Sequence, residues 1–185
     1  MFRIDHPTPN GIERNAIGGI NMILGMTPFT LFHVILSLIG IVSGLVVLAG
    51  MLASDRKEGW TLIFLITTVG TSVTGFLFPF GGFTPAIGFG IISMVFLITA
   101  IIALYVCRLA GACRWIYVVS AIVSLYLNVF VLVVQSFQKI PAFNALAPTG
   151  SEPPFAVVQG VVLVLFVFAA YLSLRRFHPL RTLAA

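Results

Sequence analysis

The charged residues of this chain fall into short groups, and long uncharged stretches separate these groups. The groups lie at positions 3–14, 55–58, 108–114, 139–152 and 175–181. A charged side chain at the centre of a bilayer costs at least roughly 2.5–3.5 kcal/mol. Charged residues make up only 8% of the chain, against about 25% in a typical soluble domain. The uncharged stretches are therefore predicted to lie in lipid, with the charged groups at its two surfaces.

The uncharged stretches contain five segments that are long enough to cross a hydrocarbon core of about 30 Å, which takes roughly 20 helical residues. The predicted spans are Phe29–Leu52, Trp60–Phe80, Pro85–Cys107, Trp115–Phe137 and Phe155–Leu174. They are continuously apolar, whereas the strands of a membrane barrel alternate apolar and polar residues. Backbone groups in lipid must be hydrogen-bonded, and an isolated apolar segment achieves this only as a helix. We therefore expect an all-α, polytopic membrane helix bundle with about five transmembrane helices.

Two of the predicted helices begin with the same local signal. Thr27 precedes Pro28, and Thr84 precedes Pro85. A threonine hydroxyl accepts a hydrogen bond from the free amides at a helix start, and the fixed φ of proline suits the first helical position. We expect Thr27 and Thr84 to be N-caps.

Basic residues are unequally shared between the two ends of the predicted bundle. One end receives seven: Arg56, Lys57, Arg108, Arg114, Arg175, Arg176 and Arg181. The other end receives three: Arg3, Arg14 and Lys139. Because lysine and arginine accumulate on the cytoplasmic side, we predict that the N-terminus lies outside and the C-terminus in the cytoplasm.

This topology divides the chain into three regions. Residues 1–28 are expected to be a short extramembrane tail, because they contain no long apolar run. Alternatively, the first residues are an artefact of start-site choice, since Met22 and Met26 directly precede the first span. Residues 29–174 form the five-helix transmembrane domain, and residues 175–185 form a basic cytoplasmic tail.

The spans lack the residues that several classes of membrane protein require. No Asp, Glu, Lys or Arg lies inside a predicted span, which argues against proton-coupled transporters, pumps and voltage sensors. The sequence contains no GxSxG, HExxH or P-loop motif. It therefore predicts no catalytic residue and no metal site, it leaves any cofactor open, and it favours a protein that is not an enzyme.

The polar side chains of the spans are most numerous near the predicted outer leaflet. The candidate ligand-binding residues are His33, Asn128, Gln135 and Gln159. Asn128 and Gln135 are seven residues apart and so share one helix face. We predict that the four converge on a pocket for a small amphipathic ligand, such as a quinone, a lipid headgroup or the edge of a cofactor. The alternative is interhelical hydrogen bonding, worth about 0.6 kcal/mol per contact.

Small residues spaced by four occur in three of the spans. They are Gly40 and Gly44 in the first span, with Ser37 one turn earlier, Thr71 and Gly75 in the second, and Ala86 and Gly90 in the third. Small residues at this spacing allow two helix backbones to approach closely. We predict that these faces pack against a neighbouring helix, either of the same chain or of another subunit.

Several short runs carry a resemblance to known proteins. They are Trp60–Phe64, Phe78–Phe80, Gly82–Ala86, Arg114–Tyr117 and Tyr126–Phe130. From about Thr27 to Pro179 the chain resembles a group of small, uncharacterised multi-pass inner-membrane proteins of proteobacteria. The resemblance implies a location in a bacterial inner membrane. It implies no activity, because none is known for the group.

Three functions remain open. The first is a non-enzymatic accessory subunit or small-ligand-binding membrane component. The second is a haem- or quinone-linked redox subunit that uses His33, although a haem held by two histidines would need a homodimer, because His6 and His178 lie elsewhere. The third is an oligomeric permease for a small uncharged solute.

Partners are predicted only in outline. The lipid bilayer is the first, and a homo-oligomer or a larger membrane complex is the second. The pI near 9.8 does not predict nucleic-acid binding, because the bases lie at span ends, where membrane topology places them.

Overall fold

The computed structural model describes residues 27–78 and 85–178, and these residues form helices joined by turns. The helices are α2 (Pro28–Leu52), α3 (Glu58–Phe76), α4 (Pro85–Ile101), η1 (Ile102–Val106), α5 (Cys113–Lys139), α6 (Pro141–Asn144) and α7 (Pro153–Arg176). Five helical segments in this part of the chain are long and apolar enough to cross a membrane. The predicted all-α, polytopic bundle is confirmed.

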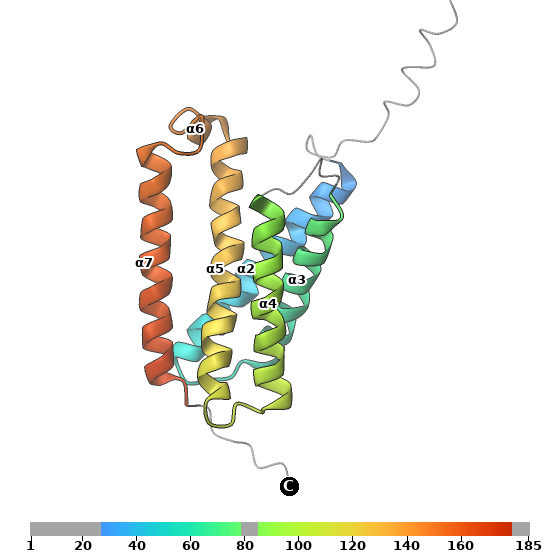
Figure 1. Cartoon of the computed structure of the whole chain (residues 1–185), viewed down its shortest axis with the longest axis vertical. Helices are drawn as coiled ribbons and strands as arrows, with labels where there is room; N and C mark the ends of the chain where they lie inside the picture. The colour runs from blue at the N-terminus through green and yellow to red at the C-terminus, as the bar shows by residue number, and fades with distance from the viewer. Residues whose placement is uncertain (1–26, 79–84, 179–185) are drawn as a thin grey trace, which may run out of the picture.

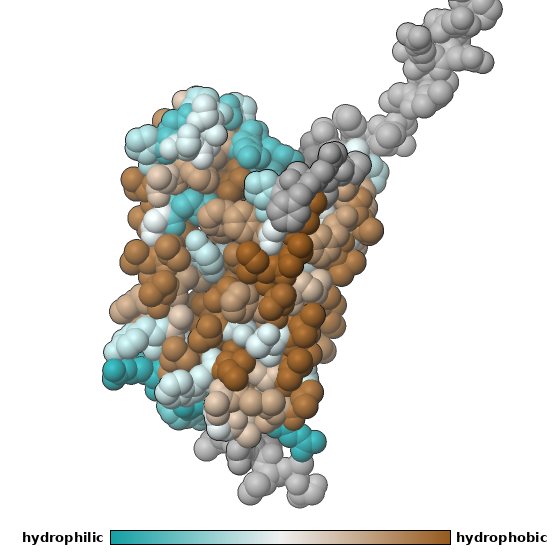
Figure 2. Space-filling model, viewed as in Figure 1, coloured by the Kyte–Doolittle hydropathy of each residue, from teal (hydrophilic) through white to brown (hydrophobic). Residues whose placement is uncertain are grey.

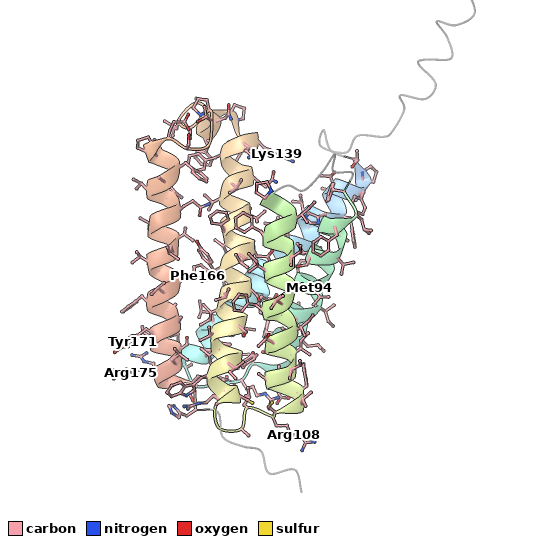
Figure 3. All side chains as sticks on the ribbon, in the orientation of Figure 1. Met94, Arg108, Lys139, Phe166, Tyr171 and Arg175 are labelled. Atoms are coloured by element: carbon pink, nitrogen blue, oxygen red, sulfur yellow. The ribbon has the colours of Figure 1, made fainter. Side chains whose placement is uncertain are left out.

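The long helices stand side by side, and α2 crosses the others obliquely (Figure 1). One end of the bundle carries the turns 53–57 and 107–112 together with residues 177–178, and we call it the basic end. The opposite end carries α6, and we call it the α6 end. Figure 3 shows Arg108 and Arg175 at the basic end and Lys139 at the α6 end. Apolar side chains occupy the zone between the two ends on the face shown in Figure 2.

The helix boundaries differ from the predicted spans in three places. The second span was expected to reach Phe80, but α3 ends at Phe76, where the amide of Leu77 donates to the carbonyl of Thr74. The third span ends in a π-helical turn, with the Cys107 amide donating to Ile102 O at 3.0 Å. The loop after α5 contains the short helix α6, which starts at Pro141. Apolar composition predicts insertion into lipid, but it does not specify hydrogen-bond register at a helix end.

One of the two predicted N-caps can be checked. Thr27 precedes α2, and its hydroxyl accepts a hydrogen bond from the amide of Thr30 at 3.2 Å. Pro28 occupies the first helical position, as expected. Thr84 lies outside the described residues.

The main core lies toward the basic end and is shared by α2, α3, α4 and α5. Phe64, Leu97, Leu104 and Leu125 are nearly inaccessible there and contact one another as one apolar cluster. The void between α2, α3 and α5 measures only about 10 Å³, barely the space for one water molecule. Van der Waals packing therefore holds these helices together, since lipid removes the hydrophobic force between them.

Helix α7 lies at the edge of the bundle and contacts mainly α5, with α2 beside it as well (Figure 1). Most of its large apolar side chains are exposed, among them Val164 and Phe168. Its C-terminal end is anchored at the basic end. There Phe177 is buried, its carbonyl accepts from Arg114 Nη1 at 3.1 Å, and the amide of His178 donates to Ser54 Oγ at 2.9 Å.

Candidate functional site

His33 lies in the second turn of α2, near the α6 end, and is half-buried against α3. Its Nδ1 atom is 2.8 Å from Thr74 Oγ1. The imidazole meets the ring of Phe78 edge to face, with 5.2 Å between centroids. The ring also lies close to Gly75, where an added Cβ would be 3.6 Å from His33 Cε1, an ordinary contact distance. Two helices thus hold the imidazole in a defined orientation.

The hydrogen bonds around Thr74 favour one tautomer of His33. Thr74 Oγ1 donates to Gly70 O at 2.8 Å, with Thr71 O at 3.1 Å. A hydroxyl has a single hydrogen to donate. With that hydrogen directed at the Gly70 carbonyl, the geometry favours a proton on His33 Nδ1 that is donated to Thr74 Oγ1. In the neutral imidazole, Nε2 then carries a lone pair and acts as an acceptor.

Asn128 lies deeper in the bundle, where α5 meets α2 and α3. Its Nδ2 atom is 3.5 Å from the position that a Cβ on Gly40 would occupy, and Thr68 Oγ1 is 3.1 Å from the same position. Both polar atoms are buried, and neither has a hydrogen-bond partner among the described residues. Two polar atoms without a described partner, one from α5 and one from α3, thus lie beside Gly40 of α2.

Gln159 and Gln135 lie at two further places. Gln159 is buried between α7 and α5, where its Nε2 donates to Phe130 O at 3.2 Å. Its Oε1 is buried without a partner in the described part of the chain. Gln135 is exposed on α5. The structure thus distributes the four predicted residues over separate helix surfaces, and no hydrogen bond between described residues joins any two of them. That each contacts a ligand remains a prediction.

The small residues of α2 pack within the chain. A Cβ on Gly44 would lie 2.5 Å from Leu125 Cδ1 and 2.9 Å from Phe64, and one on Gly40 would meet Thr67 and Thr68. Of the two uses left open for this GxxxG face, the structure therefore shows packing against α3 and α5 of the same molecule.

The other small residues occupy similar helix contacts. Ser37 is half-buried on α2, one turn before Gly40. Thr71 is buried and donates to Thr67 O at 2.8 Å, and Gly75 lies beside the ring of His33. Gly90 of α4 faces Phe76, whose ring carbon Cε1 would lie 2.8 Å from a Cβ there. The side chain of Ala86 lies outside those that the structure describes.

The sequence did not predict a groove that the structure shows at the basic end. The groove measures about 280 Å³ and lies between the start of α3 and the π-helical turn η1. Arg56, Glu58 and Thr61 form its polar side, and Leu104 and Tyr105 form the opposite wall. The two walls are more than forty positions apart in the chain. Sequence reasoning found only the charged turn, because the second wall depends on how α4 ends.

No family model, no curated protein and no solved structure matches this chain. Its class therefore rests on the fold alone. Five long apolar helices define a multi-pass helical membrane protein.

Proposed function

We propose that this protein is a non-enzymatic, small-ligand-binding component of a bacterial inner membrane, and that His33 Nε2 accepts a hydrogen bond from a hydroxyl group of the ligand. The single observation that carries the proposal is the 2.8 Å contact between His33 Nδ1 and Thr74 Oγ1. With Nδ1 engaged by Thr74, this contact supports Nε2 as the nitrogen that accepts a hydrogen bond from the ligand. A partly buried acceptor in lipid favours an amphipathic ligand with a donor group, such as a quinol.

The location is supported by the charges. Of the seven lysines and arginines among the described residues, six lie at the basic end and Lys139 lies at the α6 end. Positive residues accumulate on the cytoplasmic side of inner-membrane proteins. We propose that the basic end lies in the cytoplasm and that His33 lies in the outer leaflet.

The same nitrogen atom would suit a haem iron, so the redox interpretation needs a separate test. A haem with two histidine ligands needs a second imidazole at the same end of the bundle. Among the described residues, the other histidine is His178, which lies exposed at the basic end. The described residues therefore supply only one of the two histidine ligands at this end of the bundle.

The decisive experiment measures the binding of decylubiquinol and of decylubiquinone to the protein in nanodiscs. The quinol carries hydroxyl donors, whereas the quinone carries only carbonyl acceptors. We expect the quinol to bind about tenfold more tightly, because one hydrogen bond to an imidazole nitrogen is worth about 1.4 kcal/mol. His33→Leu should abolish this preference, and the matched control His178→Leu should keep it.

Thr74→Val tests the orientation of the imidazole separately from its presence. Without the Thr74 acceptor, the proton of His33 can move to Nε2, which then donates to a carbonyl. The preference for the quinol should disappear while both probes still bind. Equal binding of both probes to the unmodified protein, or no binding at all, would refute the proposal. A Soret band in the purified protein would favour the haem-linked interpretation instead.

A further inference from the structure

The groove at the basic end has two oppositely charged side chains on its polar side. Arg56 Nη1 and Glu58 Oε1 are 3.6 Å apart. A charge-assisted hydrogen bond is about 2.7–2.9 Å long, so this pair is not tightly joined. The side chain of Glu58 is 73% exposed and that of Arg56 is 37% exposed. Both groups can therefore turn toward a ligand that brings a positive and a negative charge.

The backbone at the start of α3 adds hydrogen-bond donors beside Arg56. The N-cap residue Lys57 is left-handed, with φ of 37°, and makes no side-chain capping hydrogen bond. The first amides of α3 are therefore without a side-chain cap, at the positive end of the helix dipole. Lys57 itself is engaged elsewhere, because its Nζ lies 2.7 Å from Asp55 Oδ2. This contact also lowers the pKa of the Asp55 carboxyl below its usual value.

A buried donor lies behind the polar wall of the groove. The Tyr117 side chain is 0% exposed, and its hydroxyl has no hydrogen-bond partner among the described residues. The side chains that interact with the Tyr117 hydroxyl are those of Thr61, Arg56 and Tyr105, and all three residues line the groove. Thr61 Oγ1 already donates to the Arg56 carbonyl at 3.1 Å.

The groove continues into an apolar strip that faces the lipid. Leu62, which lines the groove, is 49% exposed, and Ile66 is 61% exposed one turn further along α3. Residues four apart share one helix face. Trp60 is 44% exposed at the same end, a position where tryptophan commonly marks the membrane interface. A ligand here can keep charged groups in the groove while its apolar chains follow α3 into the bilayer.

We propose that this groove binds the headgroup of a zwitterionic phospholipid that carries a primary ammonium. The phosphate lies against Arg56 and the uncapped amides of α3, and the ammonium donates to the Glu58 carboxylate. The acyl chains follow Leu62 and Ile66. The commitment to a lipid, rather than to a soluble headgroup, rests on this apolar strip. A purely anionic lipid fits less well, because it brings no partner for Glu58.

The test uses the full chain in phosphatidylcholine nanodiscs that contain a small fraction of either phosphatidylethanolamine or phosphatidylglycerol. Native mass spectrometry counts the lipids that stay bound. We expect phosphatidylethanolamine to be retained about tenfold over both other lipids, as one charge-assisted hydrogen bond predicts. Choline lacks the N–H donors that Glu58 needs, and phosphatidylglycerol lacks the ammonium.

Substitutions locate the binding to the groove. A side chain added at Gly59 would meet nothing within 4 Å, so Gly59→Leu should fill the groove without disturbing the packing, and the retained lipid should be lost. Gly160→Leu is the matched control, because Gly160 on α7 is equally open. Glu58→Gln should remove the preference for phosphatidylethanolamine over phosphatidylglycerol, and Arg56→Gln should weaken the retention of both.

Two results would overturn the proposal. One is lipid retention by Gly59→Leu that equals retention by Gly160→Leu. The other is competition by water-soluble glycerophosphoethanolamine that is as strong as competition by the lipid, because the apolar strip would then contribute nothing.

Discussion

Helices α5 and α7 have almost the same hydropathy and very different surroundings. The most apolar window of each has a mean hydropathy of 2.4 in α5 and 2.5 in α7, yet 44% of that window is buried in α5 and only 6% in α7. Helix α5 contacts α2, α4 and α7, whereas α7 lies at the edge (Figure 1). Hydropathy thus predicts that a segment enters the membrane, but not how many protein neighbours it has there.

The attachments of α7 show how an edge helix is held. At the basic end, Phe177 is buried beside Tyr117, with 6.1 Å between ring centroids. Near its middle, Phe166 meets Tyr126 of α5 at 5.6 Å. Toward the α6 end, Gln159 donates to Phe130 O. The comparison with α5 suggests that a few anchors, rather than a continuous face, hold α7 in place.

The largest effect is expected for Phe177→Ala. The substitution leaves a cavity where an aromatic side chain is 1% exposed. It should lower the free energy of unfolding by about 3–5 kcal/mol. Unfolding in detergent titrations measures this change. Phe168→Ala is the matched control, because Phe168 is 59% exposed on the same helix, and its effect should stay within about 0.5 kcal/mol. Equal losses in both variants would show that α7 has no special anchor.

Gly44→Val tests the tight packing of α2 against α3 and α5. Even a Cβ at this position would lie 2.5 Å from Leu125 Cδ1 and 2.9 Å from Phe64. Overpacking of this kind should cost about 1–3 kcal/mol. The control is Gly160→Val on α7, where nothing lies within 4 Å of an added Cβ. Thermal denaturation of the two variants should separate them, and similar melting temperatures would contradict the tight contact of α2 with α3 and α5.

A smaller effect is expected for Gln159→Met. The change removes the hydrogen bond to Phe130 O and also the buried Oε1 that lacks a partner among the described residues. Because these two contributions oppose each other, the net change in unfolding free energy should not exceed about 0.6 kcal/mol. Gln135→Met on the exposed face of α5 is the control. A loss as large as that of Phe177→Ala would mean that polar contacts, not apolar packing, hold α7.

The smallest effect concerns the loop before α7. Backbone hydrogen bonds lower the pKa of Glu152 to about 2 from an ordinary 4.5. The bond from the Thr149 amide contributes most, and the bond from the Ser151 amide contributes less. A carboxyl with a lowered native pKa stabilises the fold above its unfolded pKa, and this contribution is lost as the pH falls. The loop should therefore loosen between about pH 4.5 and pH 2. Proteolysis of the loop by pepsin across this range measures the effect, and Glu152→Gln should remove the pH dependence.

The candidate site shows a similar division between what was predictable and what was not. His33 stood out in the sequence as a histidine within a span, and the structure gives it Thr74 as a partner. The convergence of His33 with Asn128, Gln135 and Gln159 was predicted from depth along the helices, and no hydrogen bond between described residues joins any two of them, so their convergence stays a prediction. Depth follows from position in a span, whereas the direction of a side chain depends on how each helix is rotated.

The sequence alone determined that this chain crosses a membrane as five helices, and the Thr27 cap of α2 was also readable from it. These properties are local, because insertion and capping depend on the residues of one segment. Only the tertiary structure decided which faces are buried, that the GxxxG face of α2 packs within the chain, and that α3 and η1 form a groove. Lipid is as apolar as leucine, so an apolar sequence does not record whether lipid or protein will cover each face.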